Sequence, residues 1–211
     1  MKQILPIFAD IANGIFATVL TGFVTHTEVV WWYFLIGIPF AMLPDLDAIP
    51  ELFIRGKVAS SSEHIRDHRD GLHFPVLFLL VGLLAGSYFG FFGYLFLSAT
   101  LLHFVNDLYG TGWGIALFWP FSRRKYKFFG SKVNQSKTML HESGESSMLK
   151  KQDQKQQLIA SWSEEELPAY IERFGFDDWI DKIYLTYNWI SVTEYALFAV
   201  SLILLIFTLL Y

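Results

Sequence analysis

Five apolar stretches dominate this 211-residue chain, and each has a length close to what a helix needs to cross a bilayer. A transmembrane helix takes about 20 mainly apolar residues, within a range of roughly 17–25. The stretches cover residues 4–24, 29–43, 74–89, 91–108 and 190–211. Because 53% of the residues are hydrophobic and only 17% are charged, the sequence predicts an all-α, polytopic membrane helix bundle with about five transmembrane helices.

The first and third stretches each raise a question of local detail. The first contains Asp10 and Asn13 and lacks the small-residue pattern of a cleavage site, so we expect a retained helix rather than a signal peptide. In the third, Gly82, Gly86 and Gly90 recur every four residues, a spacing that permits close helix approach. Glycine that is merely tolerated in a membrane helix is an equally good explanation.

The positions of the basic residues predict how the chain is oriented across the membrane. With five spans, all sixteen Lys and Arg residues lie on one side of the membrane. Since cytoplasmic loops are enriched in Lys and Arg, we expect the N-terminus and both long loops to face the cytoplasm. The chain then divides into a membrane bundle with a polar site (1–122), a cytoplasmic loop with amphipathic helices (123–189) and a C-terminal transmembrane helix (190–211).

The segment between the fourth and fifth stretches is polar. Residues 131–160 are rich in Ser, Lys and Gln and lack apolar periodicity, which predicts a mobile loop. Ser163 and Glu166 have the spacing of a capping box, with Trp162 and Leu167 placed for a hydrophobic staple, so a short helix should start there. Residues 174–189 mix aromatic with charged side chains and suit an interfacial helix.

An acidic pair ends the second stretch, where Pro44 is followed by Asp45 and Asp47. Beyond the proline we expect an extended chain, in which residues two apart point to the same side, so that both carboxylates face one point. The alternative is a helix-end turn with solvated acids, and this motif alone favours that alternative.

Three of the six histidines lie within residues 63–73, just before the third stretch. His64 and His68 are four residues apart and would share one face of a helix. Gly71 permits a tight turn that brings His73 back toward His68. The alternative is an amphipathic surface loop whose histidines gather by chance, but such a density of imidazoles favours a metal-binding or catalytic role.

The fourth stretch carries His103 and Asp107, which lie one helical turn apart on one face. An ionisable group at membrane depth is costly, about 2.5–3.5 kcal/mol for an aspartate at mid-span, and it persists when it is paired, bound to metal or lining a cavity. A hydrogen bond between the two side chains is the alternative, but it leaves the neighbouring clusters unexplained.

Topology brings these three clusters to one level of the membrane. The second stretch ends at the cytoplasmic face, the third begins there, and the fourth returns there with its polar residues in the last turns. Asp10 and Asn13 of the first stretch are weaker candidates to join them. His26 falls on the opposite side, and His141 lies in the long loop.

Imidazole and carboxylate ligands suit Zn²⁺, Mn²⁺ or iron. The sequence predicts one or two divalent ions, Zn or Mn by preference, with the candidate ligands Asp45, Asp47, His68, His73, His103 and Asp107. Two ions about 3.5–4 Å apart would suit hydrolysis, because together they activate water and clamp a phosphoryl oxygen.

Two further residues are candidates for catalysis. Arg69 would bind an anionic oxygen as a forked donor. Asp70, or whichever of Asp45 and Asp47 stays free of metal, would act as general base. A simple salt bridge from Arg69 to Asp67 or Asp70 is the alternative.

Three motifs together resemble the YdjM-like family of inner-membrane-associated metal-dependent hydrolases: residues 43–47 (LPDLD), 68–73 (HRDGLH) and 103–107 (HFVND). The glycine-rich stretch 110–114 and the Trp-Pro-Phe ending at 119–121 are also similar. The resemblance implies a location in the bacterial inner membrane and a hydrolase site made of Asp45, Asp47, His68, Arg69, His73, His103 and Asp107. Many members have Thr where this chain has Leu72, and His where it has Ala48.

Other classes of protein find less support. The chain has no cysteine for a disulfide or a thiolate zinc site, and its net charge of −4 does not favour nucleic-acid binding. We expect membrane lipids and a substrate of unknown identity as partners. The alternative function is a non-catalytic scaffold or lipid-binding protein with a structural Asp/His metal site. Its basic segment 123–127 (RRKYK) would bind anionic headgroups, although positive-inside anchoring explains that segment better. A transporter fits least, because the polar residues gather at one face instead of crossing the membrane.

Overall fold

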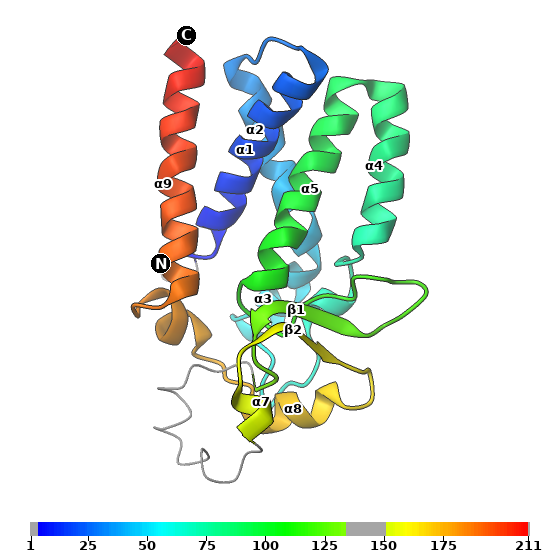
Figure 1. Ribbon diagram of the computed structural model, residues 1–211, viewed down its shortest axis with the longest axis vertical. Coiled ribbons are helices and arrows are strands. Elements are labelled where there is room, and N and C mark those ends of the chain that lie inside the picture. Colours follow the sequence, from blue (N-terminus) through cyan, green and yellow to red (C-terminus); the bar gives the residue numbers. More distant parts are fainter. Residues whose placement is uncertain (1–3, 134–150, 211) are drawn as a thin grey trace.

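The computed structural model describes residues 4–133 and 151–210, and its long helices stand side by side against a small extramembrane layer (Figure 1). The long helices are α1 (Ile7–Thr25), α2 (Trp31–Met42), α4 (Pro75–Phe89), α5 (Phe91–Tyr109) and α9 (Trp189–Leu210). Helices α1, α4 and α9 run away from the extramembrane layer, and α2 and α5 run toward it (Figure 1). These are the directions that the sequence predicts.

Three of these helices, α1, α5 and α9, are long and apolar enough to cross a membrane. Helix α2 reaches that length only together with residues 44–55, from which it is bent by 50°. Helix α4 has 15 residues, about 22 Å of helix, which is less than the hydrocarbon thickness of about 30 Å. The described residues thus give three to four candidate spans, and the expected count of five is not confirmed.

Small residues let neighbouring helices approach closely. Helix α4 packs along α5, and α1 packs against α2, α5 and α9. A Cβ added at Gly82 would lie 2.7 Å from Leu97, and one at Gly86 would lie 2.5 Å from Tyr94, both on α5. The close approach that the glycine spacing permits is therefore realised at Gly82 and Gly86.

The extramembrane layer contains an antiparallel pair of strands, β1 (Lys125–Gly130) and β2 (Gln157–Trp162). The all-α expectation is wrong here, and residues 157–160 of the expected loop are strand. The physical reason is the alternation over residues 125–128, where Lys125 and Lys127 are buried and Tyr126 and Phe128 are half-buried. His141 lies outside the described residues.

Helix α8 (Leu167–Phe174) packs with the sheet, and α7 (Lys151–Gln154) is a single turn. Their shared core consists of Trp113, Val133, Ala160, Trp162, Leu167, Ile171 and Phe174. A short helix follows as predicted, but it begins at Leu167 with Glu166 as its N-cap and without a side-chain cap. The Glu166 backbone N–H donates to Ser163 Oγ at 3.2 Å in the turn that precedes it. The expected interfacial helix over 174–189 is instead a turn, a short π-helix η5 (Ile180–Tyr184) and the beginning of α9.

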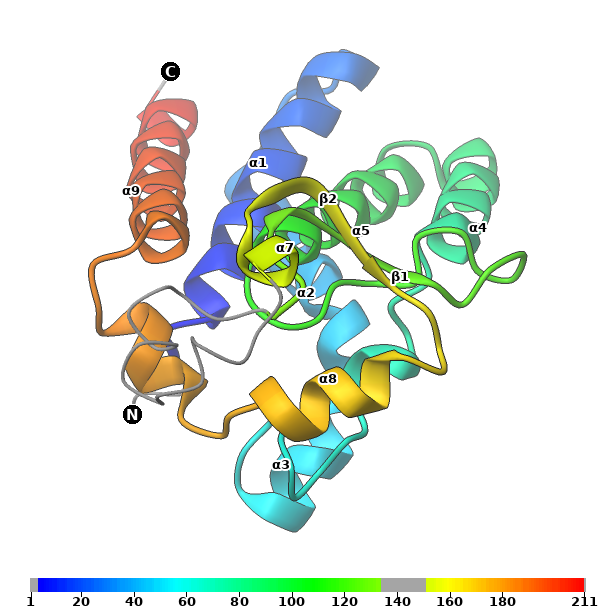
Figure 2. The ribbon, with the colours of Figure 1, turned by 60° about the horizontal axis from the view of Figure 1, so that its bottom comes forward.

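Three short elements lie where the bundle meets this layer: the 3₁₀ turns η2 (Pro44–Ala48) and η3 (His68–Asp70), and helix α3 (Ile49–Arg55). Figure 2, which turns this end of the molecule forward, shows the sheet across the ends of α2 and α5, with α3 and α8 beside it. The extramembrane layer therefore covers the ends of the helices that carry the polar clusters.

Candidate metal centre

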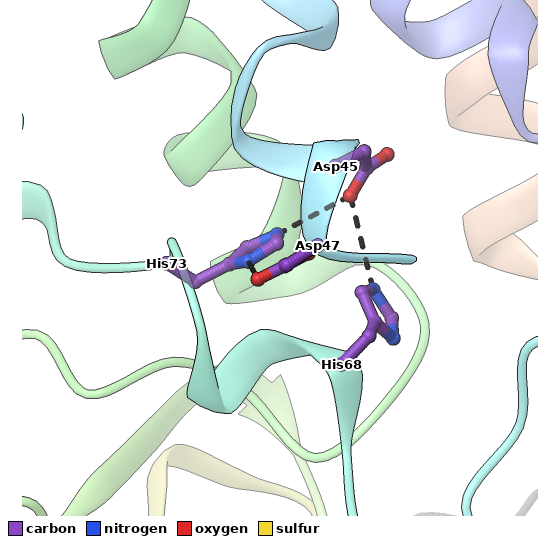
Figure 3. A group of neighbouring side chains, drawn as sticks. All are labelled: Asp45, Asp47, His68 and His73. Carbon is purple, nitrogen blue, oxygen red and sulfur yellow. Dashed lines mark hydrogen bonds and ion pairs between the residues drawn. The ribbon is translucent and has the colours of Figure 1, made fainter. Parts of the chain in front are cut away.

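The three polar clusters come together at the end of the bundle that meets the extramembrane layer. Asp45 and Asp47 lie on η2, and His68 and His73 approach them from the segment around η3 (Figure 3). His103 and Asp107 reach the same place from the last turns of α5, where both are buried. The convergence inferred from helix directions is therefore realised in the structure.

Four donor atoms gather at the centre of the cluster. His73 Nε2 lies 3.3 Å from Asp45 Oδ1 and 3.2 Å from Asp107 Oδ2. His103 Nε2 lies 3.6 Å and 3.2 Å from the same two oxygens. The two Nε2 atoms are 3.4 Å apart. The two imidazole nitrogens and the Asp107 oxygen thus form one compact group of three donors, and Asp45 Oδ1 adds an oxygen that is close to the two nitrogens.

The separations among His73 Nε2, His103 Nε2 and Asp107 Oδ2, which are 3.2–3.4 Å, match three ligand positions of a tetrahedral metal site. Ligand bonds to zinc are about 2.0–2.2 Å long, so neighbouring ligand atoms of a tetrahedron lie about 3.3–3.5 Å apart. Asp107 Oδ2 is buried and makes no hydrogen bond within the described part of the chain, although both imidazoles are near it. The donor set therefore fits a divalent ion.

Each of three ligands is held from behind by a further polar side chain. His103 Nδ1 donates to Asp10 Oδ1 at 2.7 Å, and His73 Nδ1 donates to Asp47 Oδ2 at 3.1 Å. These bonds leave the lone pair of each Nε2 directed at the centre, as in metal sites whose histidines are oriented by carboxylates. Asp47, a predicted ligand, has an orienting position here, and Asp10 has the equivalent position.

Arg69 holds the third of these ligands, Asp107. Its Nη2 donates to Asp107 Oδ1 at 2.7 Å and its Nη1 donates to the Thr111 carbonyl at 2.8 Å. A Cβ at Gly112, where φ is +82°, would lie 1.8 Å from that Nη1, so only glycine leaves room for the guanidinium. The alternative salt bridges to Asp67 or Asp70 are replaced by the pair with Asp107.

The cluster carries an excess of negative charge. Asp10, Asp45, Asp47 and Asp107 surround the two imidazoles, with the Arg69 guanidinium beside them. Burial alone would lower the pKa of His73, but Asp107, Asp45 and Asp47 raise it to about 10. The site therefore favours additional positive charge at its centre, which a divalent ion supplies.

His68 stands at the rim of the cluster. Its Nε2 lies 3.8 Å from Asp45 Oδ1, and its Nδ1 lies 3.3 Å from Asp67 Oδ1. Burial lowers the pKa of His68, and the nearby Asp67 offsets only part of that effect, so the ring is neutral near pH 7. This position suits a proton acceptor, and His68 also belongs to a second group of potential ligands with Asp45, Asp47 and His73.

Two local expectations are wrong. Residues 44–48 form a 3₁₀ turn instead of an extended chain, because Pro44 fits the first turn of a helix, and the chain bends there by 50° relative to α2. His64 and His68 do not share a helix: His64 pairs with Ser61 in a β-bridge, and its Nε2 lies 3.7 Å from Glu51, outside the cluster. His26 ends α1 at the opposite end of the bundle, as expected.

Asp70 faces Lys125, whereas the general-base role predicted for it would need its carboxylate to face the reacting water. Its carboxylate is 61% exposed and lies 2.8 Å from Lys125 Nζ, which also lies 3.1 Å from the buried Asp67. Sequence reasoning missed this Lys125–Asp67 pair, since Lys125 was part of a run interpreted as a surface anchor. The pair ties the sheet to the histidine segment. Asn13 also stays apart, with no hydrogen bond to its buried Nδ2 in the described chain.

A cavity of about 400 Å³ opens onto the cluster. Its polar end includes Asp45, His68 and His103. The rest of its wall comes from α1, α3, the segment 57–60 and the segment 175–184. It is mixed, with apolar side chains beside Lys57, Asp177, Asp178 and Asp181; the apolar ones include Ile7, Leu52, Val58, Phe176, Trp179 and Ile183. The arrangement joins a candidate metal site to a space large enough for part of a small molecule.

The two positions that depart from the family motifs have clear places in this geometry. The backbone N–H of Leu72 donates to Asp47 Oδ2 at 2.7 Å, a contact that does not depend on the side chain. Ala48 lines the cavity, so the histidine that many members have there would add a donor to its wall.

A bundle of membrane helices with a buried Asp/His cluster at one end defines a polytopic membrane protein with a candidate metal centre. Residues 10–164 match the family described as YdjM inner membrane protein. The chain belongs to this family, which confirms the resemblance of its three motifs. No curated protein and no solved structure matched the chain.

Proposed function

We propose that this protein is a membrane-bound, metal-dependent hydrolase that acts on a phosphoester or lipid-derived substrate at the membrane face where its cavity opens. The observation that carries the proposal is the group of His73 Nε2, His103 Nε2 and Asp107 Oδ2, which lie 3.2–3.4 Å apart beside that cavity. Structural metal sites are closed by four protein ligands, whereas catalytic ones have three and keep an open position, so three close donors beside a cavity favour catalysis over a structural role.

His73, His103 and Asp107, with Asp45 beside the two imidazoles, would hold one ion, Zn²⁺ or Mn²⁺. Bound there, a divalent ion supplies a Lewis acid for the substrate and lowers the pKa of a water molecule. The protein's part is to orient these donors, which Asp10, Asp47 and Arg69 do from behind.

His68 is the general base of the proposal. Its neutral ring faces the cavity and accepts the proton of the attacking water at Nε2, while Asp67 stabilises the imidazolium through Nδ1. Arg69 has an orienting role here, because its guanidinium is engaged by Asp107 and Thr111. We do not carry the general-base role over to Asp70, whose carboxylate pairs with Lys125.

The apolar side chains in the cavity wall support a substrate with an apolar part. Leu52 lines the cavity and is also exposed, and the next residues of α3, Phe53 and Ile54, are 85% and 83% exposed. Apolar side chains exposed next to membrane-spanning helices suit the lipid interface. A substrate held with its anionic head at the cluster and its apolar part along α3 fits this surface.

Hydrolysis is tested with the purified full chain in detergent, loaded with Zn²⁺ or Mn²⁺. The probes are p-nitrophenyl phosphate and phosphatidic acid in mixed micelles. We expect turnover that a chelator removes. His68→Ala should lower kcat by about 10²–10⁴-fold without removing the ion held by the central group, and His64→Ala serves as the matched histidine control.

Metal binding without turnover of either probe would contradict the hydrolase and favour the scaffold with a structural metal site. The alternative in which the segment 123–127 binds anionic lipid headgroups has less support in the structure. In the segment 123–127, Lys125 and Lys127 are both buried, which leaves Arg123 and Arg124 as its accessible cations.

We also propose that the site and the N-terminus face the cytoplasm of a bacterial inner membrane. The Lys and Arg residues that the structure describes lie at the end of the bundle that carries the extramembrane layer, which is the cytoplasmic pattern. A reporter fused after Asn134 should be active only as a cytoplasmic reporter. Activity of a periplasmic reporter at that position would reverse the orientation.

A further inference from the structure

Helix α9 carries a buried carboxylate that the proposed mechanism does not use. Glu194 is 1% exposed within a 22-residue apolar helix. An ionisable side chain inside a membrane span is costly and marks functional sites more often than structural ones. Glu194 lies outside the residues that match the family, 10–164, so no family motif accounts for it.

The partner of Glu194 is a phenol in the wall of the cavity. Tyr184, the last residue of η5, donates from its hydroxyl to Glu194 Oε2 at 2.6 Å. Tyr184 lines the cavity together with Asp10, Arg69, His103 and Asp107. It is itself buried, and Tyr195 donates to its backbone carbonyl at 2.8 Å, which fixes its position. The phenol therefore connects Glu194 with the space beside the metal centre.

The second oxygen of Glu194 is unsatisfied. Oε1 is buried and has no hydrogen bond within the part of the chain that the structure describes. It lies next to the end of α5 that carries Asp107, since a Cβ on Gly110 would be 3.3 Å from it. A buried carboxyl with one strong bond and one unused oxygen is suited to exchange a proton, whereas a purely structural role would call for both oxygens to be bonded.

We propose that Tyr184 and Glu194 form a proton-donating pair for the leaving group of the substrate, an inference that rests on the proposed hydrolase function. Tyr184 is the catalytic residue of the pair because it is the one that lines the cavity. Glu194 is a positioning residue that acts through Tyr184. Burial and the neighbouring Glu194 raise the pKa of the Tyr184 phenol well above its usual range, which keeps the donor protonated.

In hydrolysis of a phosphoester, the oxygen of water forms a new bond to phosphorus, and its proton passes to His68 Nε2. The phenolic O–H of Tyr184, which donates to Glu194 Oε2 in the free protein, turns to the leaving oxygen, and Glu194 protonated at Oε2 donates to the phenol oxygen instead. The bond from phosphorus to the leaving oxygen breaks, and that oxygen takes the phenolic proton of Tyr184. The carboxyl proton of Glu194 passes to the phenol oxygen and leaves a carboxylate. Transfer of the proton from His68 back to Glu194 through solvent completes the cycle.

The test compares two esters in the metal-loaded full chain. Phenyl phosphate has a basic leaving group that needs a proton, and p-nitrophenyl phosphate has an acidic one that does not. Tyr184→Phe and Glu194→Gln should each lower the phenyl phosphate rate by about 10²-fold while changing the p-nitrophenyl rate by less than about threefold. Tyr187→Phe is the matched control, because Tyr187 is 95% exposed in the same segment. An equal loss for both esters, or no loss, would overturn the proposal.

A second measurement decides the proposal even if the wild type hydrolyses neither ester, a result that would count against the hydrolase itself. Infrared difference spectra are recorded when inorganic phosphate is added to the zinc-loaded protein. We expect a protonated-carboxyl band that is present in the wild type and in Glu172→Gln but lost in Glu194→Gln. A spectrum without such a band would show that Glu194 does not respond to the cavity and would overturn the pair.

Discussion

Replacement of His103 by alanine is expected to remove most of the metal affinity of this protein. His103 contributes one of the four central donors, and its Nε2 lies within 3.6 Å of the other three. A structural zinc site is worth about 10–16 kcal/mol in total, so one ligand of four accounts for roughly 3–4 kcal/mol, or about 10²–10³-fold in affinity. Equilibrium dialysis of the purified chain against Zn²⁺ or Mn²⁺ measures this loss.

Two matched variants serve as references for the expected loss of metal affinity. Asp10→Asn keeps the shape of the side chain that holds His103 Nδ1 but weakens its orienting bond, so affinity should fall only about 10–100-fold. His64→Ala removes a histidine outside the cluster and should leave affinity unchanged. If His103→Ala binds as much metal as His64→Ala does, the central group is not the metal site.

Replacement of Lys125 by methionine is expected to cause the largest loss of stability. Lys125 and Asp67 form an ion pair at 3.1 Å in which both side chains are only 5% exposed. Removal of one partner leaves a buried, uncompensated charge, which typically costs about 3–5 kcal/mol. Thermal or denaturant unfolding in detergent measures the change. Arg123→Met is the matched control, because its pair with Glu164 is exposed and worth about 0–1 kcal/mol.

The pH dependence of this loss follows from Asp67. Burial alone would raise the pKa of Asp67, but Lys125, with His68 and Arg69, holds it well below its usual range. A depressed pKa contributes stability above the unfolded value, near 3.9 by the rough reference scale, and that stability is lost as the pH falls through the folded value. Without Lys125 the pKa of Asp67 rises, so the deficit of the variant should be greatest near neutral pH and shrink toward about pH 4. The additional change Asp67→Asn should recover much of the loss at neutral pH. A Lys125→Met protein as stable as the Arg123→Met control would contradict this account.

The hydrophobic pattern and the directions of the helices could be predicted from the sequence because both depend on local composition. Those directions were sufficient to bring residues of η2, η3 and α5 to one end of the bundle. The number of spans was harder to predict than these directions. Whether α2 includes the bent segment after Pro44, and whether the short α4 crosses the bilayer, depend on packing and not on apolar length alone.

Which side chains face the centre of the site and which orient them from behind could not be predicted from the sequence. Asp45 and Asp47 are two residues apart, and only the 3₁₀ turn after Pro44 directs one toward the centre and the other behind His73. Asp10 reaches His103 across 93 residues of sequence, a contact that depends on how α1 packs against α5. Tyr184 and Glu194 were missed for a similar reason, although a glutamate in the last apolar stretch was a visible signal.

The strand β1 was predictable in principle. The alternation of polar and apolar residues over 125–128 is typical of a half-buried strand, although here the lysines and not the apolar residues occupy the buried side. The basic composition of the segment drew attention to membrane anchoring instead. The carboxylate partner that stabilises Lys125 is Asp67, which is distant in the sequence, and nothing local indicated it.

The central claim is that two imidazoles and two carboxylates share one divalent ion at the end of this bundle. X-ray absorption spectroscopy at the zinc edge of the zinc-loaded chain tests it most directly. The account predicts about one zinc per chain at limiting zinc, with two imidazole nitrogens and the remaining ligands oxygen, at roughly 2.0–2.2 Å. A protein that retains no zinc, or a zinc shell without imidazole scattering, would contradict it.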